Sequence, residues 1–452
     1  MSAANSKPSA AVIVGLGRTG LSCARYLRER GWRLAVTDTR AEPPQLAALR
    51  ALDPQIPLRL GGLDAGLLEE ALCVVVSPGV SLQEPFLAEA RRRGLEVVGD
   101  IELFARAVDA PVAGITGTNG KSTVTTLVGR MAARAGVTVR VGGNLGEPAL
   151  ELLSAAHHAG QAVGLYVLEL SSFQLETTHS LDLAAAAVLN VSPDHLDRYA
   201  SVAAYADAKA RIFARCDTAV INLDDPLVVA MPHPGQRTLS FSLRAAIGAD
   251  YAVAMHTGGA WLMRRGEPLL PVSAMRIRGL HNAANALAAL ALGEALGLPL
   301  PAMLAELEEF PGLPHRTQWI AKVSGVTYID DSKGTNVGAT IAAVAGMQGP
   351  LVIIAGGEGK QQDFGPLAAA FRGKVRHTVL IGRDGPLVGE ALRGVCTLER
   401  CSSLEEAVRA AAAAARAGDT VLLSPACASL DMFRDYAHRG AVFAQAVKEL
   451  AA

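Results

Sequence analysis

The sequence predicts an α/β protein in which three successive domains are each built on a parallel-rich sheet. Short apolar runs typical of buried strands alternate with segments of helical spacing along the chain. Glycine-rich or polar loops follow many of these runs, as they do at the C-terminal edges of parallel strands. The chain has 452 residues, 50% of them hydrophobic, which suffices for about three cores of ordinary size.

The first domain is expected over residues 1–108 and begins with a strand at 11–14. The loop Gly15-Leu16-Gly17-Arg18-Thr19-Gly20 and a helix follow, and a second strand ends in Asp38. This is a dinucleotide-binding fingerprint, which places a diphosphate at a helix N-terminus. Further strands at 73–76 and 96–98 complete a Rossmann-like sheet. The pattern leaves open a nicotinamide or flavin dinucleotide, another diphosphate-containing nucleotide, or a purely structural turn.

A phosphate-binding loop is expected at the start of the second domain. An apolar strand from Val112 runs into three glycines, then Lys121, Ser122 and Thr123, and a helix follows. Glycines admit backbone N–H groups to a polyphosphate, and the helix N-terminus adds unpaired donors. Lys121 is expected to reach the β- and γ-phosphates, and a hydroxyl to reach a magnesium ion. The strict pattern requires glycine where Ile115 stands, and a flexible turn with a solvated lysine is the alternative.

Two further strand ends in the second domain carry candidate metal ligands. A strand at 165–168 delivers Glu169 to the sheet edge where ligands collect, and a strand at 184–191 leads to Asp194 and His195. Carboxylates suit magnesium, and a histidine between carboxylates can bind a divalent ion or carry a proton.

The rest of the second domain is less specific. Lys209, on a helix expected over 202–215, has the pattern of an ordinary surface lysine. Asn282 and Asn285 lie three apart on an alanine-rich helix, so their amides can contact an adenine edge, although surface polarity explains them equally well. Short strands are expected within 261–271. We therefore predict a central P-loop ATPase-like domain with a mixed sheet over residues 109–312.

A third, Rossmann-like domain is expected over residues 313–452. The linker before it, residues 310–316, is rich in proline and glycine. Polar or glycine-rich loops follow strands expected at 327–329, 351–355, 378–381 and 420–423, an arrangement that binds small anionic ligands. Lys333 and Lys360 can pair with carboxylates, Ser429 can donate to one, and Arg316 at the hinge can clamp a phosphate.

Composition excludes several classes of function. Lysine and arginine total 42 against 43 for aspartate and glutamate, and aromatic residues make up 4%, so no nucleic-acid partner is expected. No apolar run approaches the roughly 20 residues of a membrane span. The six cysteines are scattered without metal-binding spacing. We expect a cytoplasmic, monomeric protein whose thiols are reduced.

Taken together, five motifs resemble those of the Mur ligase family, and the similarity covers nearly the whole chain. Within the family, the segments 331–336 and 424–431 resemble its D-glutamate-adding members. The resemblance implies an ATP-dependent amide ligase that adds D-glutamate to UDP-N-acetylmuramoyl-L-alanine through an acyl phosphate, in peptidoglycan precursor synthesis. The motifs are Gly117-Thr118-Asn119-Gly120-Lys121-Ser122-Thr123, Glu169-Leu170-Ser171-Ser172-Phe173-Gln174-Leu175, Asp194-His195, Gly279-Leu280-His281-Asn282 and Pro314-His315-Arg316.

The resemblance also implies a role for each candidate residue. Catalysis would involve Lys121, Glu169, His195, Lys209 and Arg316. ATP would be held by Gly117, Thr118, Asn119, Gly120, Lys121, Ser122, Thr123, Asn282, Asn285, Arg316 and Asp331. The UDP-precursor would be held by Arg18, Thr19, Asp38, Thr39, Arg40, Gly79, Asn144 and His195. D-glutamate would be held by Lys333, Thr335, Lys360, Ser429 and Tyr436. Two Mg²⁺ sites would use Ser122, Glu169, His195 and Lys209, the last as a carbamate.

This chain departs from the family pattern at two positions. Gly334 stands where alanine is usual and Tyr436 where phenylalanine is usual. Three alternatives remain open. A sister ligase would add another amino acid or act on folate, an oxidoreductase would bind NAD at the first loop, and a regulator would bind ATP without turnover.

Overall fold

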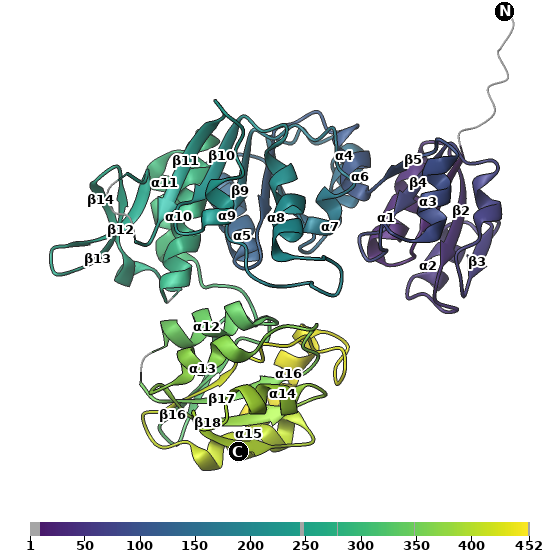
Figure 1. The fold of residues 1–452 in the computed structure, drawn as a ribbon. Coiled ribbons are helices and arrows are strands. Elements are labelled where there is room, and N and C mark those ends of the chain that lie inside the picture. The colour runs from purple at the N-terminus through teal and green to yellow at the C-terminus, as the bar shows by residue number, and fades with distance from the viewer. Residues whose placement is uncertain (1–9, 245–247, 278, 348, 451–452) are drawn as a thin grey trace, which may run out of the picture.

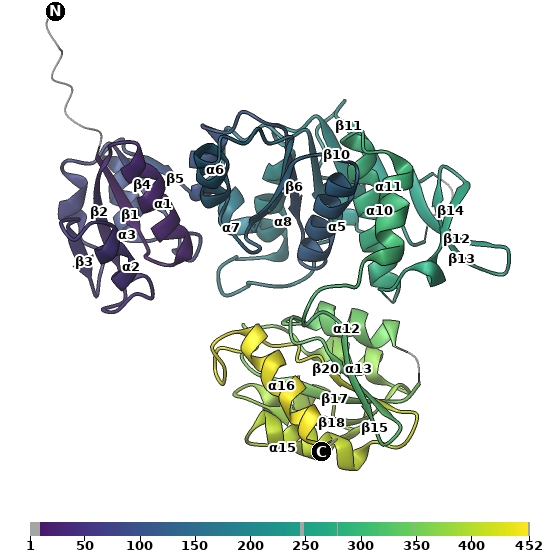
Figure 2. The same cartoon turned by 180° about the vertical axis from the view of Figure 1, so that it is seen from behind.

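Three sheets follow one another along the chain in the computed structural model, which describes residues 10–244, 248–277, 279–347 and 349–450. The N-terminal part lies beside the central part, and the C-terminal part lies against the central part on another side (Figure 1). The view from behind shows the same arrangement (Figure 2). The predicted α/β class with three successive sheets is therefore confirmed.

The first sheet has five parallel strands in the order β3-β2-β1-β4-β5. The central strand β1 lies between β2 and β4, so the chain order reverses there and a crevice opens at the C-terminal ends of these strands. Asp38 is the last residue of β2 and lies at this edge. The elements are β1 (Ala10–Val14), α1 (Arg18–Glu29), β2 (Arg33–Asp38), α2 (Leu46–Leu52), β3 (Leu58–Leu60), η1 (Ala65–Leu68), β4 (Cys73–Val76), α3 (Pro85–Arg92) and β5 (Glu96–Val98).

Helix α4 (Asp100–Ala105) leads into the second sheet, which has nine strands in the order β14-β13-β12-β11-β10-β9-β6-β8-β7. Strands β6 to β12 pair in parallel, whereas β13 and β14 are antiparallel, so the predicted mixed sheet is confirmed. Its strands are β6 (Val112–Thr116), β7 (Val139–Gly143), β8 (Leu165–Glu169), β9 (Ala185–Val188), β10 (Thr218–Asn222), β11 (Arg237–Ser242), β12 (Tyr251–His256), β13 (Gly259–Arg264) and β14 (Glu267–Pro271).

The helices of this part cover both faces of the sheet. They are α5 (Lys121–Arg134), α6 (Ala149–His158), α7 (Ser172–Leu175), α8 (Val202–Ala210), η2 (Arg211–Phe213), α9 (Pro226–Val229), η3 (Val272–Ala274), α10 (Leu280–Ala295) and α11 (Leu300–Glu309). The single helix predicted over 202–215 is wrong in its length, because α8 ends at Ala210 and tightens into the 3₁₀ turn η2.

The third sheet has six strands in the order β15-β16-β20-β17-β18-β19, of which only the edge strand β15 is antiparallel among the described residues. The four strands predicted from the sequence are β16, β17, β18 and β20. The elements are β15 (Gln318–Val323), β16 (Val326–Asp330), α12 (Val337–Gly346), β17 (Leu351–Gly356), α13 (Gly365–Phe371), β18 (Val375–Ile381), α14 (Gly385–Ala391), β19 (Thr397–Arg400), α15 (Leu404–Ala414), β20 (Thr420–Leu423) and α16 (Tyr436–Leu450).

The first two sheets share one apolar core. Buried residues of the first sheet and of α4 belong to the same cluster as residues of β8 and α6, and the rings of Phe104 and Tyr166 meet edge to face at 5.2 Å. The C-terminal part has its own separate clusters. Among the described residues, no helix has the length and apolarity needed to cross a membrane.

Candidate functional site

The phosphate-binding loop connects β6 to α5 at the C-terminal edge of the second sheet. Gly117 and Gly120 have φ angles of 146° and 85°, which a side chain would strain. The amide of Asn119 donates to Asn190 Oδ1 at 2.8 Å, and Asn190 Nδ2 returns a bond to the Asn119 carbonyl at 3.1 Å. Lys121 Nζ donates to the carbonyls of residues 117 and 118 at 2.8 and 2.9 Å. The loop is thus held in shape, with an amine that phosphate oxygens can attract.

Oxygen ligands gather directly beside this loop. The Ser122 hydroxyl donates to Glu169 at 2.5 Å, and Asn144 Nδ2 donates to the other oxygen of the same carboxylate at 2.6 Å. Arg316 Nη2, from the C-terminal part, donates to the Ser122 hydroxyl at 2.6 Å. Glu169 is only 3% exposed. Its burial raises the carboxyl pKa, but nearby Lys121 and these hydrogen bonds outweigh burial and lower it, so the group is ionised.

A second group of side chains lies around the ring of Tyr205. Lys209 is 1% exposed, its Nζ donates to the Gly117 carbonyl at 3.0 Å, and it lies 4.3 Å from the centre of that ring. Burial, together with the charge of Lys121, lowers the pKa of Lys209 well below its ordinary value, which favours a neutral amine. Burial also lowers the pKa of His195 to about 4, so its imidazole is neutral at pH 7.

The residues around both groups line one cavity of about 280 Å³, here called the central pocket. Lys333, Thr335 and Lys360 reach it from the C-terminal part. Burial lowers the pKa of Lys333 to about 8. Ser429 and Tyr436, predicted to bind D-glutamate, are not among its lining residues. The centre of the Tyr436 ring instead lies 3.8 Å from Lys333 Nζ, a cation–π contact that helps to position the lysine.

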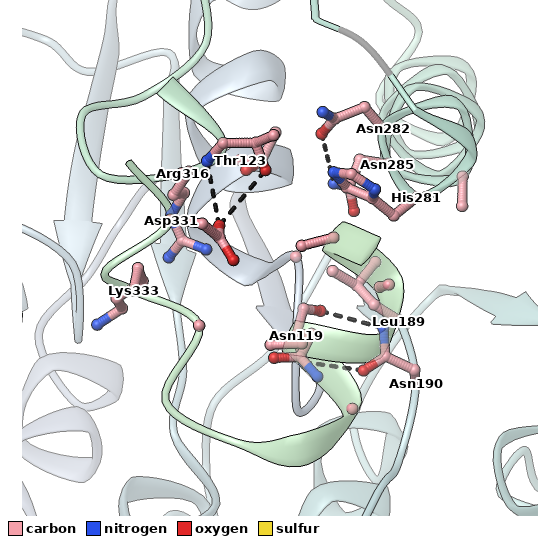
Figure 3. Close-up of a pocket in the computed structure, with 18 of the residues that line it drawn as sticks. Asn119, Thr123, Leu189, Asn190, His281, Asn282, Asn285, Arg316, Asp331 and Lys333 are labelled. Carbon is pink, nitrogen blue, oxygen red and sulfur yellow. Dashed lines mark hydrogen bonds between the residues drawn. The ribbon is translucent and has the colours of Figure 1, made fainter. Parts of the chain in front are cut away.

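A cavity of about 320 Å³, the α10 pocket, adjoins the phosphate loop. Asn282 and Asn285 project into it from α10, and Asp331 faces them from the C-terminal part (Figure 3). Asp331 accepts hydrogen bonds from the Thr317 amide at 3.1 Å and the Ser424 hydroxyl at 2.8 Å. Burial nevertheless raises the pKa of Asp331 to about 7. Amides on one wall and a carboxyl group on the other suit a nucleoside.

The first sheet carries a cavity of about 460 Å³, the N-terminal pocket, at its C-terminal edge. It is lined by seven of the eight residues predicted to hold a UDP-precursor, namely Arg18, Thr19, Asp38, Thr39, Arg40, Gly79 and Asn144. The eighth, His195, lies in the central pocket instead, because it follows β9 of the second sheet.

Asp38 does not present a free carboxylate in this pocket. It accepts from the Leu16 amide at 2.7 Å and from Arg40 Nη2 at 2.7 Å. Burial alone would raise the pKa of Asp38, but these hydrogen bonds lower it to about 2. The carboxylate therefore shapes the two loops, and much of its capacity to accept ribose hydroxyls is already used.

The three pockets share walls. Asn144 lines both the N-terminal and the central pocket. Residues of the phosphate loop and two cations line both the central and the α10 pocket, namely Asn119, Gly120, Arg316 and Lys333. The order is therefore N-terminal pocket, central pocket, α10 pocket, with the phosphate loop between the last two.

Some residues that shape the site are not predicted from the sequence. Asn190 fixes the phosphate loop, but it falls inside the strand expected at 184–191, which in the structure ends at Val188. Arg439 on α16 is fully buried and holds two loops of the C-terminal part, yet one arginine in a helical segment looks like a surface residue in sequence. Asn336 caps α12, which its place before an apolar helix indicates.

Comparison with known proteins agrees with this geometry. Family models described as "Mur ligase MurD-like, N-terminal domain", "Mur ligase middle domain" and "Mur ligase, glutamate ligase domain" match residues 9–99, 115–293 and 315–427. The fold is that of a three-domain Mur ligase, and this chain belongs to the Mur ligase family.

Individual relatives show which members of the family this chain is similar to. The chain is 52% identical over 443 residues to the UDP-N-acetylmuramoylalanine--D-glutamate ligase of Methylococcus capsulatus, covering 98% of this chain and 95% of that one. It is 54% identical over 441 residues to the enzyme of that name from Nitrosococcus oceani, covering 97% and 96%. Among solved structures, UDP-N-acetylmuramate-alanine ligase MurC from Thermotoga maritima superposes with a TM-score of 0.62 at 20% identity, covering 97% of this chain and 99% of that one, a likeness of fold.

Proposed function

We infer that this chain is an ATP-dependent ligase that joins D-glutamate to UDP-N-acetylmuramoyl-L-alanine in peptidoglycan synthesis. The similarity to D-glutamate ligases extends over nearly the whole length of both chains. The structural observation that carries the inference is the shared wall between three pockets, which gives a precursor, a phosphoryl donor and an amino acid access to one cavity.

The proposed division of labour follows the three sheets. Residues 1–108 would hold the UDP part of the precursor, residues 109–312 would hold ATP, and residues 313–452 would hold D-glutamate. The limits of the three matched family models lie within these ranges. We also propose that the protein is a cytoplasmic monomer. The need for ATP and the six unpaired cysteines support the cytoplasmic location.

The reaction would begin in the central pocket. The alanine carboxylate attacks the γ-phosphate of ATP, forming an acyl phosphate and ADP. Lys121 and Arg316 lie where negative charge develops, because one belongs to the phosphate loop and the other bonds to Ser122. The amine of D-glutamate then attacks the acyl carbon, the C–O bond to phosphate breaks, and the amine loses a proton. The departing phosphate can take up that proton, because burial lowers the pKa of His195 to about 4 and makes its imidazole the weaker base.

The residues present fit a magnesium ion beside the phosphate loop. The ionised Glu169 and the Ser122 hydroxyl are hard oxygen donors in contact with each other. Across the described ranges, no group of three or more His, Cys, Asp or Glu side chains is arranged to hold a metal. Such an ion would therefore complete its shell with water and phosphate oxygens, as magnesium commonly does. When bound, it would neutralise charge on the phosphates.

A second ion is proposed near His195 and Lys209. The neutral imidazole is a competent ligand, and a buried neutral amine is the form that captures CO₂ to become a carbamate. Lys209 is proposed as that carbamate. A ¹³C carbamate signal in protein supplied with labelled bicarbonate should be present in the natural chain and absent from Lys209→Arg; an identical signal in both would reject the assignment.

The test of the function is phosphate release from ATP with UDP-N-acetylmuramoyl-L-alanine and a panel of D- and L-amino acids. D-glutamate should give the fastest release and a new amide product. Lys121→Ala should abolish turnover while leaving precursor affinity nearly intact, because the N-terminal pocket does not include Lys121. Faster release with glycine or L-alanine would instead indicate a sister ligase.

The dinucleotide alternative is disfavoured by the family match over the first sheet rather than by Asp38. That carboxylate is engaged by Arg40 and the Leu16 amide, and is no more available to an NAD ribose than to the ribose of UDP. Saturable NADH binding in a fluorescence titration would count against the ligase.

A further inference from the structure

Asn336 joins the C-terminal part of the chain to the phosphate loop. Its Oδ1 accepts the Ala339 amide at 2.8 Å, which caps helix α12. The same side chain exchanges two hydrogen bonds with Asn119 of the phosphate loop, at 3.2 and 3.3 Å. Its Nδ2 also donates to Asp194 at 3.2 Å. Asn336 is 3% exposed, and three of its hydrogen bonds cross the contact between the second and third sheets.

The partners of Asn336 are themselves fixed. The Asn119 backbone is held on both sides by Asn190, so its side chain is left to contact the C-terminal part. Asp194 follows β9 and receives Lys360 Nζ at 3.3 Å, a second bond between the same two parts. The bonds of Asn336 therefore connect the phosphate loop to the lysines that line the central pocket from the other side.

The chemistry of this position favours asparagine. The Ala339 amide can only donate, so the oxygen of Asn336 must face it and the nitrogen must face Asp194. Aspartate would cap the helix equally well but would place a second carboxylate against Asp194. Serine would also cap the helix but is too short to reach across the contact. Capping alone therefore does not explain the choice of residue.

We propose that Asn336 is a positioning residue that couples the nucleotide-binding loop to the amino-acid-binding part, by bonding Asn119 and Asp194 from the cap of α12. Thr335 and Lys333 precede Asn336 by one and three residues and line the central pocket. The hydrogen bonds of Asn336 therefore fix the positions of these two side chains in that pocket. The proposal deepens the proposed function and rests on it for the identity of the amino acid.

Asn336→Ser is the informative variant, because serine keeps the helix cap and removes the bridge. The KM for D-glutamate should rise about tenfold, as expected for the loss of two to three buried hydrogen bonds. The Kd for AMP-PNP should rise less than the KM for D-glutamate, because the phosphate loop keeps Asn190. Ser403→Ala is the matched control: it removes the cap of α15, where Ser403 Oγ accepts the Glu406 amide, and should change neither constant.

Small-angle X-ray scattering tests the coupling without turnover. Adding AMP-PNP with Mg²⁺ should contract the natural chain and the Ser403→Ala control more than Asn336→Ser. Equal contraction in all three, or a KM for D-glutamate unchanged in Asn336→Ser, would overturn the proposal. If D-glutamate supports no turnover in the natural chain, the proposed function fails while the scattering comparison still decides the coupling.

Discussion

Replacing Arg439 by methionine should loosen the amino-acid side of the site. The guanidinium is 0% exposed, and within the described residues it donates to Ser332, Cys427 and Ala428. It donates to the Ser332 carbonyl at 2.8 Å and to the Cys427 carbonyl at 3.1 Å. These carbonyls belong to the loops after β16 and β20, which carry Lys333 and Ser429. One buried side chain thus holds both loops together.

The magnitude follows from the groups that lose their partner. Ala428 O keeps the Glu358 amide, and the Ser332 hydroxyl keeps the Tyr436 carbonyl. Only the carbonyls of Ser332 and Cys427 are left without a hydrogen bond from the described part of the chain. Two such carbonyls cost about 2–6 kcal/mol. Burial lowers the pKa of Arg439 to about 10, a sign that its charge is costly, so methionine recovers some energy and we expect about 2–3 kcal/mol.

Thermal unfolding and steady-state kinetics check this expectation. A loss of about 2–3 kcal/mol should lower the Tm of the C-terminal part by roughly 5–10 °C. The KM for D-glutamate should rise about tenfold or more while that of the UDP-precursor changes little. Arg409→Met, on the exposed face of α15, is the control and should match the natural chain. If Arg439→Met behaves like Arg409→Met in both measurements, the carbonyls do not depend on the guanidinium and the reasoning is refuted.

Three further predictions concern pH and the phosphate loop. Asp38→Asn should lower the free energy of unfolding at pH 7 by about 1–2 kcal/mol. A folded pKa of about 2 corresponds to about 2.5 kcal/mol, and this value is reduced because the arginine partner is 51% exposed. Since the folded pKa is depressed, chemical denaturation should show the difference in stability above about pH 4 and its loss as pH falls toward 2. ADP affinity should rise with pH from 6 to 8, because Asp331, whose pKa is about 7, ionises over this range and accepts hydrogen bonds from ribose hydroxyls. Calorimetric titration of Asp331→Asn should show that this rise in affinity with pH is lost. Gly120→Ala should weaken AMP-PNP binding at least tenfold, since a Cβ at residue 120 would lie 2.3 Å from Asn285 Oδ1 and φ is +85°. Gly136→Ala is the control, because Gly136 shares the positive φ but a Cβ there meets no atom within 4 Å. Comparable weakening in both variants would show that backbone strain, not the collision with Asn285, is responsible.

Local patterns predicted the parts of the site that lie on one strand, one loop and one helix. The phosphate loop is of this kind, because strand, glycines and helix N-terminus are adjacent in sequence and geometry allows few other arrangements. Glu169 was predicted for the same reason, as the last residue of a strand. The edge strand β15 was missed because its residues are exposed or only partly buried and show little hydrophobic alternation.

Properties that arise from tertiary burial were not predictable from periodicity. Lys209 looks like a surface lysine on its helix, and only packing against the phosphate loop buries the amine and lowers its pKa. The family resemblance, not the pattern of residues around it, singled out this lysine. The cavity that His195 lines was likewise not predictable from periodicity, because it depends on how β9 and its following loop pack beside the phosphate loop.

The two interfaces within the chain have different physical character, and this suits their proposed tasks. The first and second parts share a continuous apolar core, which cannot open without exposing that surface to water. The C-terminal part instead contacts the phosphate loop through polar side chains such as Asn336, Arg316 and Lys360. Water can replace such bonds at small net cost, so this contact can form and break in each cycle. Under the proposed division of labour, a rigid part for the precursor and nucleotide and a separable part for the amino acid would let substrates enter the central pocket and would then exclude water from the acyl phosphate.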